Sequence, residues 1–261
     1  MFKPPIAVTL ALLSVLLVSG RADALTYPVR GVPVLTDNGL YRGGEIKPSK
    51  CPGGALSIES TAAAKRTLAA LWRCLNTSWS AHAKRARLPF APARLVVLTK
   101  PARFCGKSWS KDLIARYCPA TKTAAILVND KYYLRTREIY HFQHVAGIYG
   151  THLQHVNGME RGFEALPSRN QAERFEKERR WSLQARCLGG VFLGSVWETA
   201  GEGSEGWPAL LELVKANGDH NSKTRRHFGK GGNIVHWLDR GFRSGDPGSC
   251  NTWKASSARV A

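Results

Sequence analysis

Apolar residues recur with a helical period in three long stretches of the chain. The first follows Ser60 and Thr61, which can cap a helix, and its apolar face comprises Leu68, Leu71, Trp72 and Leu75. A second helix is predicted over about residues 137–157, and a third runs from Asn170 past Val191. These apolar faces predict helices that pack into a common core.

Short apolar runs typical of strands lie between the first two helices. Residues 95–99 and 125–128 predict strands, joined by an excursion that contains two cysteines. Residues 25–57 are rich in Gly, Pro and Lys and predict an extended lead-in with turns. No internal repeat is present, and strands and helices do not alternate regularly. The predicted fold class is therefore α+β.

The N-terminus has the pattern of an export signal. Lys3 precedes an apolar run over residues 6–18, and Ala22-Asp23-Ala24 follows as a small-x-small cleavage site. We predict a secretory signal peptide over residues 1–24. The alternative is an uncleaved membrane anchor, although the run is short for a membrane span. Both interpretations predict a secreted or extracytoplasmic protein.

Six cysteines remain after this leader, an even number that is typical of disulfides in an exported protein. Six cysteines allow 15 connectivities, and the sequence alone does not choose among them. Proximity along the chain favours Cys51 with Cys74 and Cys105 with Cys118, which leaves Cys187 with Cys250. No CxxC spacing occurs, so a zinc–thiolate site is not expected.

The charge of the chain suggests what it contacts. The formal net charge is +19, and loss of the leader lowers it by only one unit. About 235 residues then remain, enough for one large domain with a substantial core. Such a charge favours anionic partners, here an anionic envelope component or an acidic exported protein. No specific nucleic-acid binding is expected, because no binding motif accompanies the charge. Membrane contact is expected only through the N-terminus or through charge.

Two motifs in the middle of the chain carry a family resemblance. Tyr149-Gly150-Thr151-His152-Leu153-Gln154 is followed by Arg179-Arg180-Trp181-Ser182-Leu183-Gln184-Ala185-Arg186-Cys187. Further pieces are Phe104-Cys105-Gly106, Tyr117-Cys118-Pro119, Trp237-Leu238-Asp239-Arg240-Gly241-Phe242, Gly245-Asp246-Pro247 and Cys250-Asn251-Thr252-Trp253. Over about residues 60–253 the chain resembles the neutral zinc metallopeptidases of bacteria. The resemblance implies a zincin-like domain, with two core helices packed on a small sheet and stabilised by disulfides.

The same resemblance implies that the zinc site has been lost. In that family one helix carries His-Glu-x-Gly-His-His-x-Gln, and the second carries Arg-Arg-x-Glu-Leu-Gln-Ala-Asp-Cys. When Gly150 and Gln154 are matched to the first motif, the metal-binding histidines correspond to Gly147 and Thr151, and the general base corresponds to Ile148. The third ligand corresponds to Ser182, and the following Asp to Arg186. Zinc is expected for the family, but with these residues we expect no cofactor, because none supplies a ligand and Arg186 opposes a dication.

A histidine-based metal site is the alternative. On a continuous helix His141, His144, His152 and His155 fall at about 0°, 300°, 20° and 320°, taking ~100° per residue, so they share one face. The two i,i+3 pairs are about 12 Å apart at ~1.5 Å per residue, too far for one ion to use all four. The simpler interpretation is four histidines without a metal.

These observations lead to three functional hypotheses. The first is an exported pseudopeptidase that binds a peptide, another exported protein or an anionic envelope component without cleaving it. The second is an active metal-dependent hydrolase with a relocated histidine site, and the third is a basic structural envelope protein. The expected organisation is a signal peptide (1–24), an extended lead-in (25–58), a metallopeptidase-like domain (59–253) and a C-terminal tail (254–261).

Overall fold

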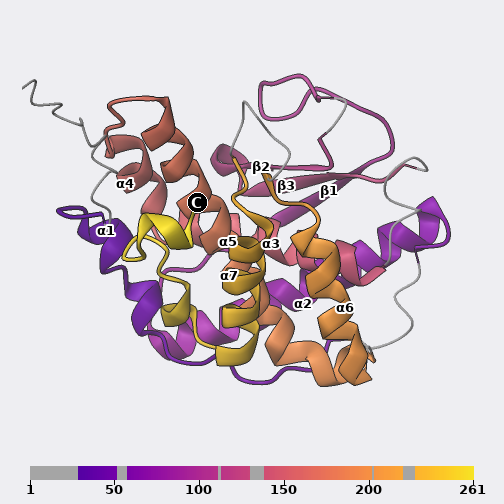
Figure 1. The fold of residues 1–261 in the computed structure, drawn as a ribbon. Helices are drawn as coiled ribbons and strands as arrows, with labels where there is room; N and C mark the ends of the chain where they lie inside the picture. Colours follow the sequence, from indigo (N-terminus) through magenta and orange to yellow (C-terminus); the bar gives the residue numbers. More distant parts are fainter. Residues whose placement is uncertain (1–28, 52–57, 111–112, 130–137, 202, 220–226) are drawn as a thin grey trace, which may run out of the picture.

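A computed structural model describes residues 29–51, 58–110, 113–129, 138–201, 203–219 and 227–261. Within these ranges the chain is an α+β protein with seven α-helices and one three-stranded sheet, which confirms the predicted class. The sheet lies at one end of the molecule, above a larger helical body (Figure 1). The predicted signal peptide lies outside the described residues.

The sheet has the order β1-β3-β2. β1 (Arg94–Leu98) runs parallel to β3 (Thr123–Leu127), and β2 (Ala115–Cys118) runs antiparallel to it. β3 is central and wholly buried, as expected for its apolar sequence. The two predicted strands are confirmed to within two residues. β2 was not predicted, because its four residues mix Arg and Tyr with Ala and Cys and show no alternation.

Helix α2 (Thr61–Ala86) begins and ends where its sequence predicts a boundary. The Ser60 hydroxyl accepts a hydrogen bond from the Ala63 amide at 3.1 Å, a typical N-cap. Arg87 ends the helix in the left-handed conformation at φ 54°. The predicted apolar face is confirmed, since Leu68, Leu71, Trp72 and Leu75 are all buried.

Helices α3 (Glu138–Val156) and α5 (Gln171–Ala200) form the centre of the molecule, and both were predicted. Asn170 caps α5 by accepting a hydrogen bond from the Glu173 amide at 3.0 Å. The two helices approach closely because glycine lies at their crossing. A β-carbon on Gly150 would overlap the carbonyl of Ala185, and one on Gly189 would meet the backbone of Gly147.

The remaining helices complete the core around this pair. They are α1 (Pro33–Thr36), α4 (Met159–Ala165), α6 (Gly203–Lys215) and α7 (Gly231–Ser244). Short 3-10 helices follow at Gly39–Arg42 (η1), Pro119–Thr121 (η2), Pro247–Cys250 (η4) and Ser257–Arg259 (η5). α6 and α7 were not predicted, because glycines interrupt their apolar pattern. In α7, Gly241 lets the backbone pack directly on Cys187 of α5.

Both ends of the described chain pack on the core. The lead-in, predicted to be extended, instead contains α1 and η1, which bury Leu35 and Leu40. Burial of these few apolar side chains is favourable in free energy, whereas an extended segment would leave them exposed to solvent. At the C-terminal tail Val260 is buried, and its carbonyl accepts a hydrogen bond from Arg179 at 2.7 Å.

Three disulfides link Cys51 to Cys74, Cys105 to Cys118 and Cys187 to Cys250, which confirms the pairing favoured by proximity. No cysteine is free. The disulfides indicate an oxidising, extracytoplasmic environment. Among the helices within the described ranges, none has the length and apolar character needed to cross a membrane.

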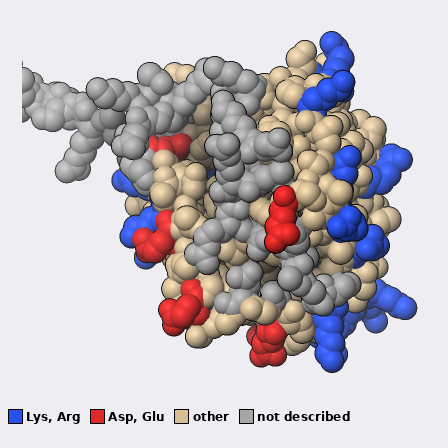
Figure 2. Space-filling view, turned by 90° about the vertical axis from the view of Figure 1, so that its right-hand side faces the viewer, with Lys and Arg blue, Asp and Glu red and all other residues tan. Residues whose placement is uncertain are grey.

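Positive charge is concentrated in one part of the sequence. The chain has no acidic residue between Glu59 and Asp112. Helix α2 lies in this stretch, and its exposed cations are Lys65, Arg66, Arg73, Lys84 and Arg85. Figure 2 shows most of the Lys and Arg of the viewed face along its right-hand edge, with a smaller group at the left edge, where most of the Asp and Glu also lie. The charge is therefore asymmetric rather than spread evenly.

Candidate functional site

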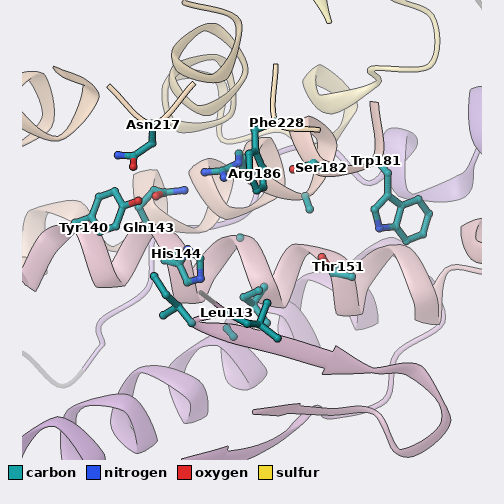
Figure 3. Close-up of a pocket in the computed structure, with 15 residues that line it drawn as sticks. Leu113, Tyr140, Gln143, His144, Thr151, Trp181, Ser182, Arg186, Asn217 and Phe228 are labelled. Carbon is teal, nitrogen blue, oxygen red and sulfur yellow. The ribbon is translucent and has the colours of Figure 1, made fainter. Parts of the chain in front are cut away.

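A pocket of about 470 Å³ opens between α3 and α5 and is bordered by the segment that leads into β2. In Figure 3, Tyr140, Gln143, His144 and Thr151 come from α3, whereas Trp181, Ser182 and Arg186 come from α5. Its size lies in the range typical of small-molecule and peptide-residue sites. The full lining comprises Leu113, Ile114, Ala115, Tyr140, Gln143, His144, Gly147, Ile148, Thr151, Trp181, Ser182, Ala185, Arg186, Asn217 and Phe228.

The pocket brings together all five positions that the family resemblance singled out. Gly147, Ile148 and Thr151 lie within about one turn of α3, and Ser182 and Arg186 lie one turn apart on α5. Residues at i and i+4 share a helix face. The close crossing of α3 and α5 then places the two groups in one cavity.

Among the described residues that line this pocket, Arg186 is the one cation, and none of them is acidic. Burial lowers the pKa of its guanidinium, while Tyr140 and Asp219 oppose the shift. An arginine remains charged despite such a shift, because its guanidinium is a far stronger base than any other side chain. Its guanidinium carbon lies 5.9 Å from the centre of the Phe228 ring, a cation–π distance.

Asp219 is the acidic group whose charge acts on Arg186, but its carboxylate is already engaged. The same Asp219 oxygen accepts hydrogen bonds from the backbone amides of Phe228 and Gly229, at 2.6 and 2.8 Å. These bonds hold the Phe228 segment over the pocket. Asp219 therefore positions an aromatic wall of the pocket and does not pair with Arg186.

Three buried polar atoms of the pocket have no hydrogen-bond partner among the described residues. They are Nε of Arg186, Oε1 of Gln143 and Nε2 of His144. Buried polar atoms are usually paired, so three such atoms around one pocket, two on α3 and one on α5, point to a site that pairs with a ligand. Burial lowers the pKa of His144 to about 4, and Arg186 and His141 act in the same direction. His144 is therefore neutral at neutral pH.

The four histidines on α3 have different surroundings. His152 is fully buried: its Nε2 donates to the Ala91 carbonyl and its Nδ1 accepts from the Tyr117 hydroxyl, both at 2.8 Å. His155 pairs through Nδ1 with Glu160 at 2.6 Å, and His141 is buried. Only His144 of the four lines the pocket.

These surroundings do not form a histidine cage. Both ring nitrogens of His152 are occupied, so neither is available to a metal unless a hydrogen bond breaks. Within the described part of the chain there is no group of three or more His, Cys, Asp or Glu side chains arranged to hold a metal ion.

The residues of the pocket also do not fit the zinc that the resemblance implies. Gly147 has no side chain, Ile148 has no donor atom, and Thr151 and Ser182 offer only neutral hydroxyls. Structural and catalytic zinc sites use imidazole, thiolate or carboxylate ligands. The permanent charge of Arg186 in the same cavity further opposes a dication. We therefore derive no metal-dependent step at this site.

Several pocket residues were not singled out from the sequence. Gln143 and Tyr140 lie about one and two turns before Gly147 on α3, and Trp181 lies inside the quoted α5 motif. A helical projection from Gly147 would have found the α3 residues. Leu113, Asn217 and Phe228 come from distant segments, and no local pattern marks them.

Comparison of the chain with protein families, with curated proteins and with solved structures found no match. The resemblance to zinc metallopeptidases therefore rests on the sequence motifs alone.

Proposed function

We propose that this chain is an exported binding protein with the scaffold of a neutral zinc metallopeptidase, in which the former metal site has become a ligand pocket. The observation that carries the proposal is the pocket itself. All five positions matched to the family's metal site line it, yet none supplies a metal ligand, and three of its buried polar atoms are unpaired. Fold and catalytic site are separable, so a scaffold can persist after its chemistry is lost.

The surroundings of the histidines argue against the alternative of a relocated catalytic metal. His152 is held between Tyr117 and Ala91, and His155 is paired with Glu160. Water needs a bound metal or a positioned base to become a nucleophile at neutral pH. His144 is neutral and lies in the pocket, but no carboxylate among the lining residues orients it.

The first experiment measures metal content and peptidase activity of protein purified with its disulfides intact. We expect substoichiometric metal by elemental analysis and no cleavage of an unfolded protein substrate, with or without added zinc. An unselected peptide library should nevertheless yield ligands that protect pocket residues from hydrogen exchange. Near-stoichiometric zinc together with chelator-sensitive cleavage would overturn the proposal.

A second experiment tests the zincin-like scaffold. The combined variant Gly147→His, Ile148→Glu, Thr151→His, Ser182→Glu restores the ligands and base of the family motif. Gly147 has room for a side chain, because a β-carbon there would lie 3.9 Å from its nearest neighbour, Arg186. We expect this variant to bind Zn²⁺ in the micromolar range or tighter, and more tightly with Arg186→Asp added. A folded variant without affinity for zinc would refute the matched register.

Helix α2 contains no acidic residue, and its exposed cations support a second, compatible role in holding the protein near an anionic envelope component. Five exposed cations on one helix with no acidic residue create a positive potential that attracts polyanions. This role requires only charge, whereas the pocket requires a specific ligand.

A further inference from the structure

Resting on the proposed binding function, we propose that the pocket binds a monocarboxylate with a neutral, apolar body, such as the C-terminal residue of a peptide, and that Arg186 holds the carboxylate. The guanidinium is the one charge among the described residues of the lining, and its carbon lies 5.9 Å from the centre of the Phe228 ring.

The first argument is that Arg186 is available. Its Nε is buried without a hydrogen-bond partner among the described residues. The acidic group that acts on it, Asp219, is committed to the amides of Phe228 and Gly229. Leaving a buried cationic donor unpaired costs free energy, and an incoming anion removes that cost. An arginine presents parallel N–H donors that match the two oxygens of a carboxylate.

The second argument concerns the charge of the ligand. One cation in a cavity with apolar walls balances one negative charge. A phosphate dianion would leave an uncompensated charge in the same low-dielectric surroundings. A carboxylate monoanion is therefore the better match, because the described lining holds no second cation for another anionic group.

The third argument concerns the rest of the ligand. The walls include Leu113, Ile148, Trp181 and Phe228, which favour an apolar or aromatic body. No Asp or Glu belongs to the described lining, so the pocket lacks a partner for a free ammonium group. Free amino acids, which carry an ammonium group, are thus disfavoured as ligands. Amino acids acylated on nitrogen lack that charge and fit the pocket. The unpaired Oε1 of Gln143 is an acceptor suited to an amide N–H, which a peptide C-terminus supplies.

The test uses N-acetylphenylalanine as the probe and N-acetylphenylalaninamide as its uncharged match, measured by titration calorimetry on the full chain exported with its disulfides. We expect the Kd of the acid to be lower than that of the amide by about tenfold or more, because only the carboxylate forms a charge-assisted hydrogen-bond pair with the guanidinium. Free phenylalanine should bind more weakly than the acetylated acid. A peptide ending in phenylalanine should compete, and its C-terminal amide should not.

Two variants complete a thermodynamic cycle. Arg186→Gln should bind acid and amide equally, which assigns the carboxylate to this side chain. Arg174→Gln is the matched control, because it removes one positive charge from the exposed face of the same helix. It should keep the wild-type preference.

The outcomes separate this inference from the proposed function. The ligand class is refuted if the acid does not bind at millimolar concentration, or if Arg186→Gln retains the preference for the acid. If library peptides protect the pocket from hydrogen exchange equally in the wild type and in Arg186→Gln, that result would support the binding function and refute only the carboxylate ligand class. Stoichiometric zinc with cleavage would refute the binding function itself.

Discussion

Two glycines of α3, Gly147 and Gly150, lie three residues apart and serve different purposes. A β-carbon on Gly150 would overlap the Ala185 carbonyl, so this glycine sets how closely α3 approaches α5. A β-carbon on Gly147 would make only ordinary contacts of 3.9 Å or more, to Arg186 and Gln143. Gly150 is therefore required by packing, whereas Gly147 leaves room in the pocket.

This difference predicts opposite effects of one methyl group. Gly150→Ala should lower the free energy of unfolding by about 2 kcal/mol or more, because a rigid backbone has to move to admit the β-carbon. Gly147→Ala should be neutral or stabilising by up to about 1 kcal/mol, since alanine favours a helix over glycine. Urea denaturation of both variants measures the difference. Equal effects would show that the helix crossing does not depend on Gly150.

At the scale of elements, His152 joins α3 to the sheet region. Its ring bridges Tyr117 of β2 and the Ala91 carbonyl just before β1. Burial lowers the pKa of His152 to about 4; His155 and Lys122 add to the shift, and the hydrogen bond to Ala91 opposes it. The unfolded chain keeps a histidine pKa near 6.5, so between these values the unfolded state binds more protons than the folded state.

The free energy of unfolding should therefore be fully maintained above about pH 6.5 and fall as the pH drops toward 4, by up to about 3 kcal/mol for this one histidine. His152→Gln keeps a donor and an acceptor in place. Its free energy of unfolding should fall less between pH 7 and 4.5 than that of the wild type. Denaturant titrations at both pH values measure these free energies. If the free energy of unfolding of His152→Gln fell with pH as steeply as that of the wild type, the prediction would be contradicted.

At the scale of the whole molecule, the charge asymmetry is the feature that supports the proposed contact with anionic surfaces. The cations of α2 have no acidic neighbours along the helix, whereas α5 and α7 pair some of theirs internally, as in Arg180–Glu176 and Arg243–Asp239. Paired charges contribute little to a long-range field, but unpaired ones add to it.

We expect binding to vesicles that contain phosphatidylglycerol, lost as salt is raised from about 20 to 300 mM because screening shortens the reach of the charges. The triple variant Arg66→Gln, Arg73→Gln, Lys84→Gln should bind on the order of 100-fold more weakly, at about 1 kcal/mol per cation near the surface. The control Arg161→Gln, Arg174→Gln, Arg243→Gln removes the same charge elsewhere. An equal loss in both variants would mean that net charge, and not α2, drives binding.

Much of the fold could be predicted because its signals are local. Ser60 and Asn170 cap the helices that follow them, and the apolar runs of β1 and β3 are long enough to identify. The disulfide pairing followed from proximity along the chain. β2, α6 and α7 could not be predicted, because short mixed strands and glycine-interrupted helices form only when tertiary packing outweighs their weak local preference.

The sequence by itself determined the α+β class, the three long helices and the absence of metal-ligand side chains at Gly147, Ile148, Thr151 and Ser182. Each of these follows from residue identity or from the spacing of neighbours. Only the tertiary structure decided that these positions face one cavity, that Asp219 is engaged by the Phe228 segment, and that Nε of Arg186 has no hydrogen-bond partner among the described residues. Those properties depend on residues up to about 80 positions apart, and contacts over such separations are set by how the helices cross and not by any local pattern.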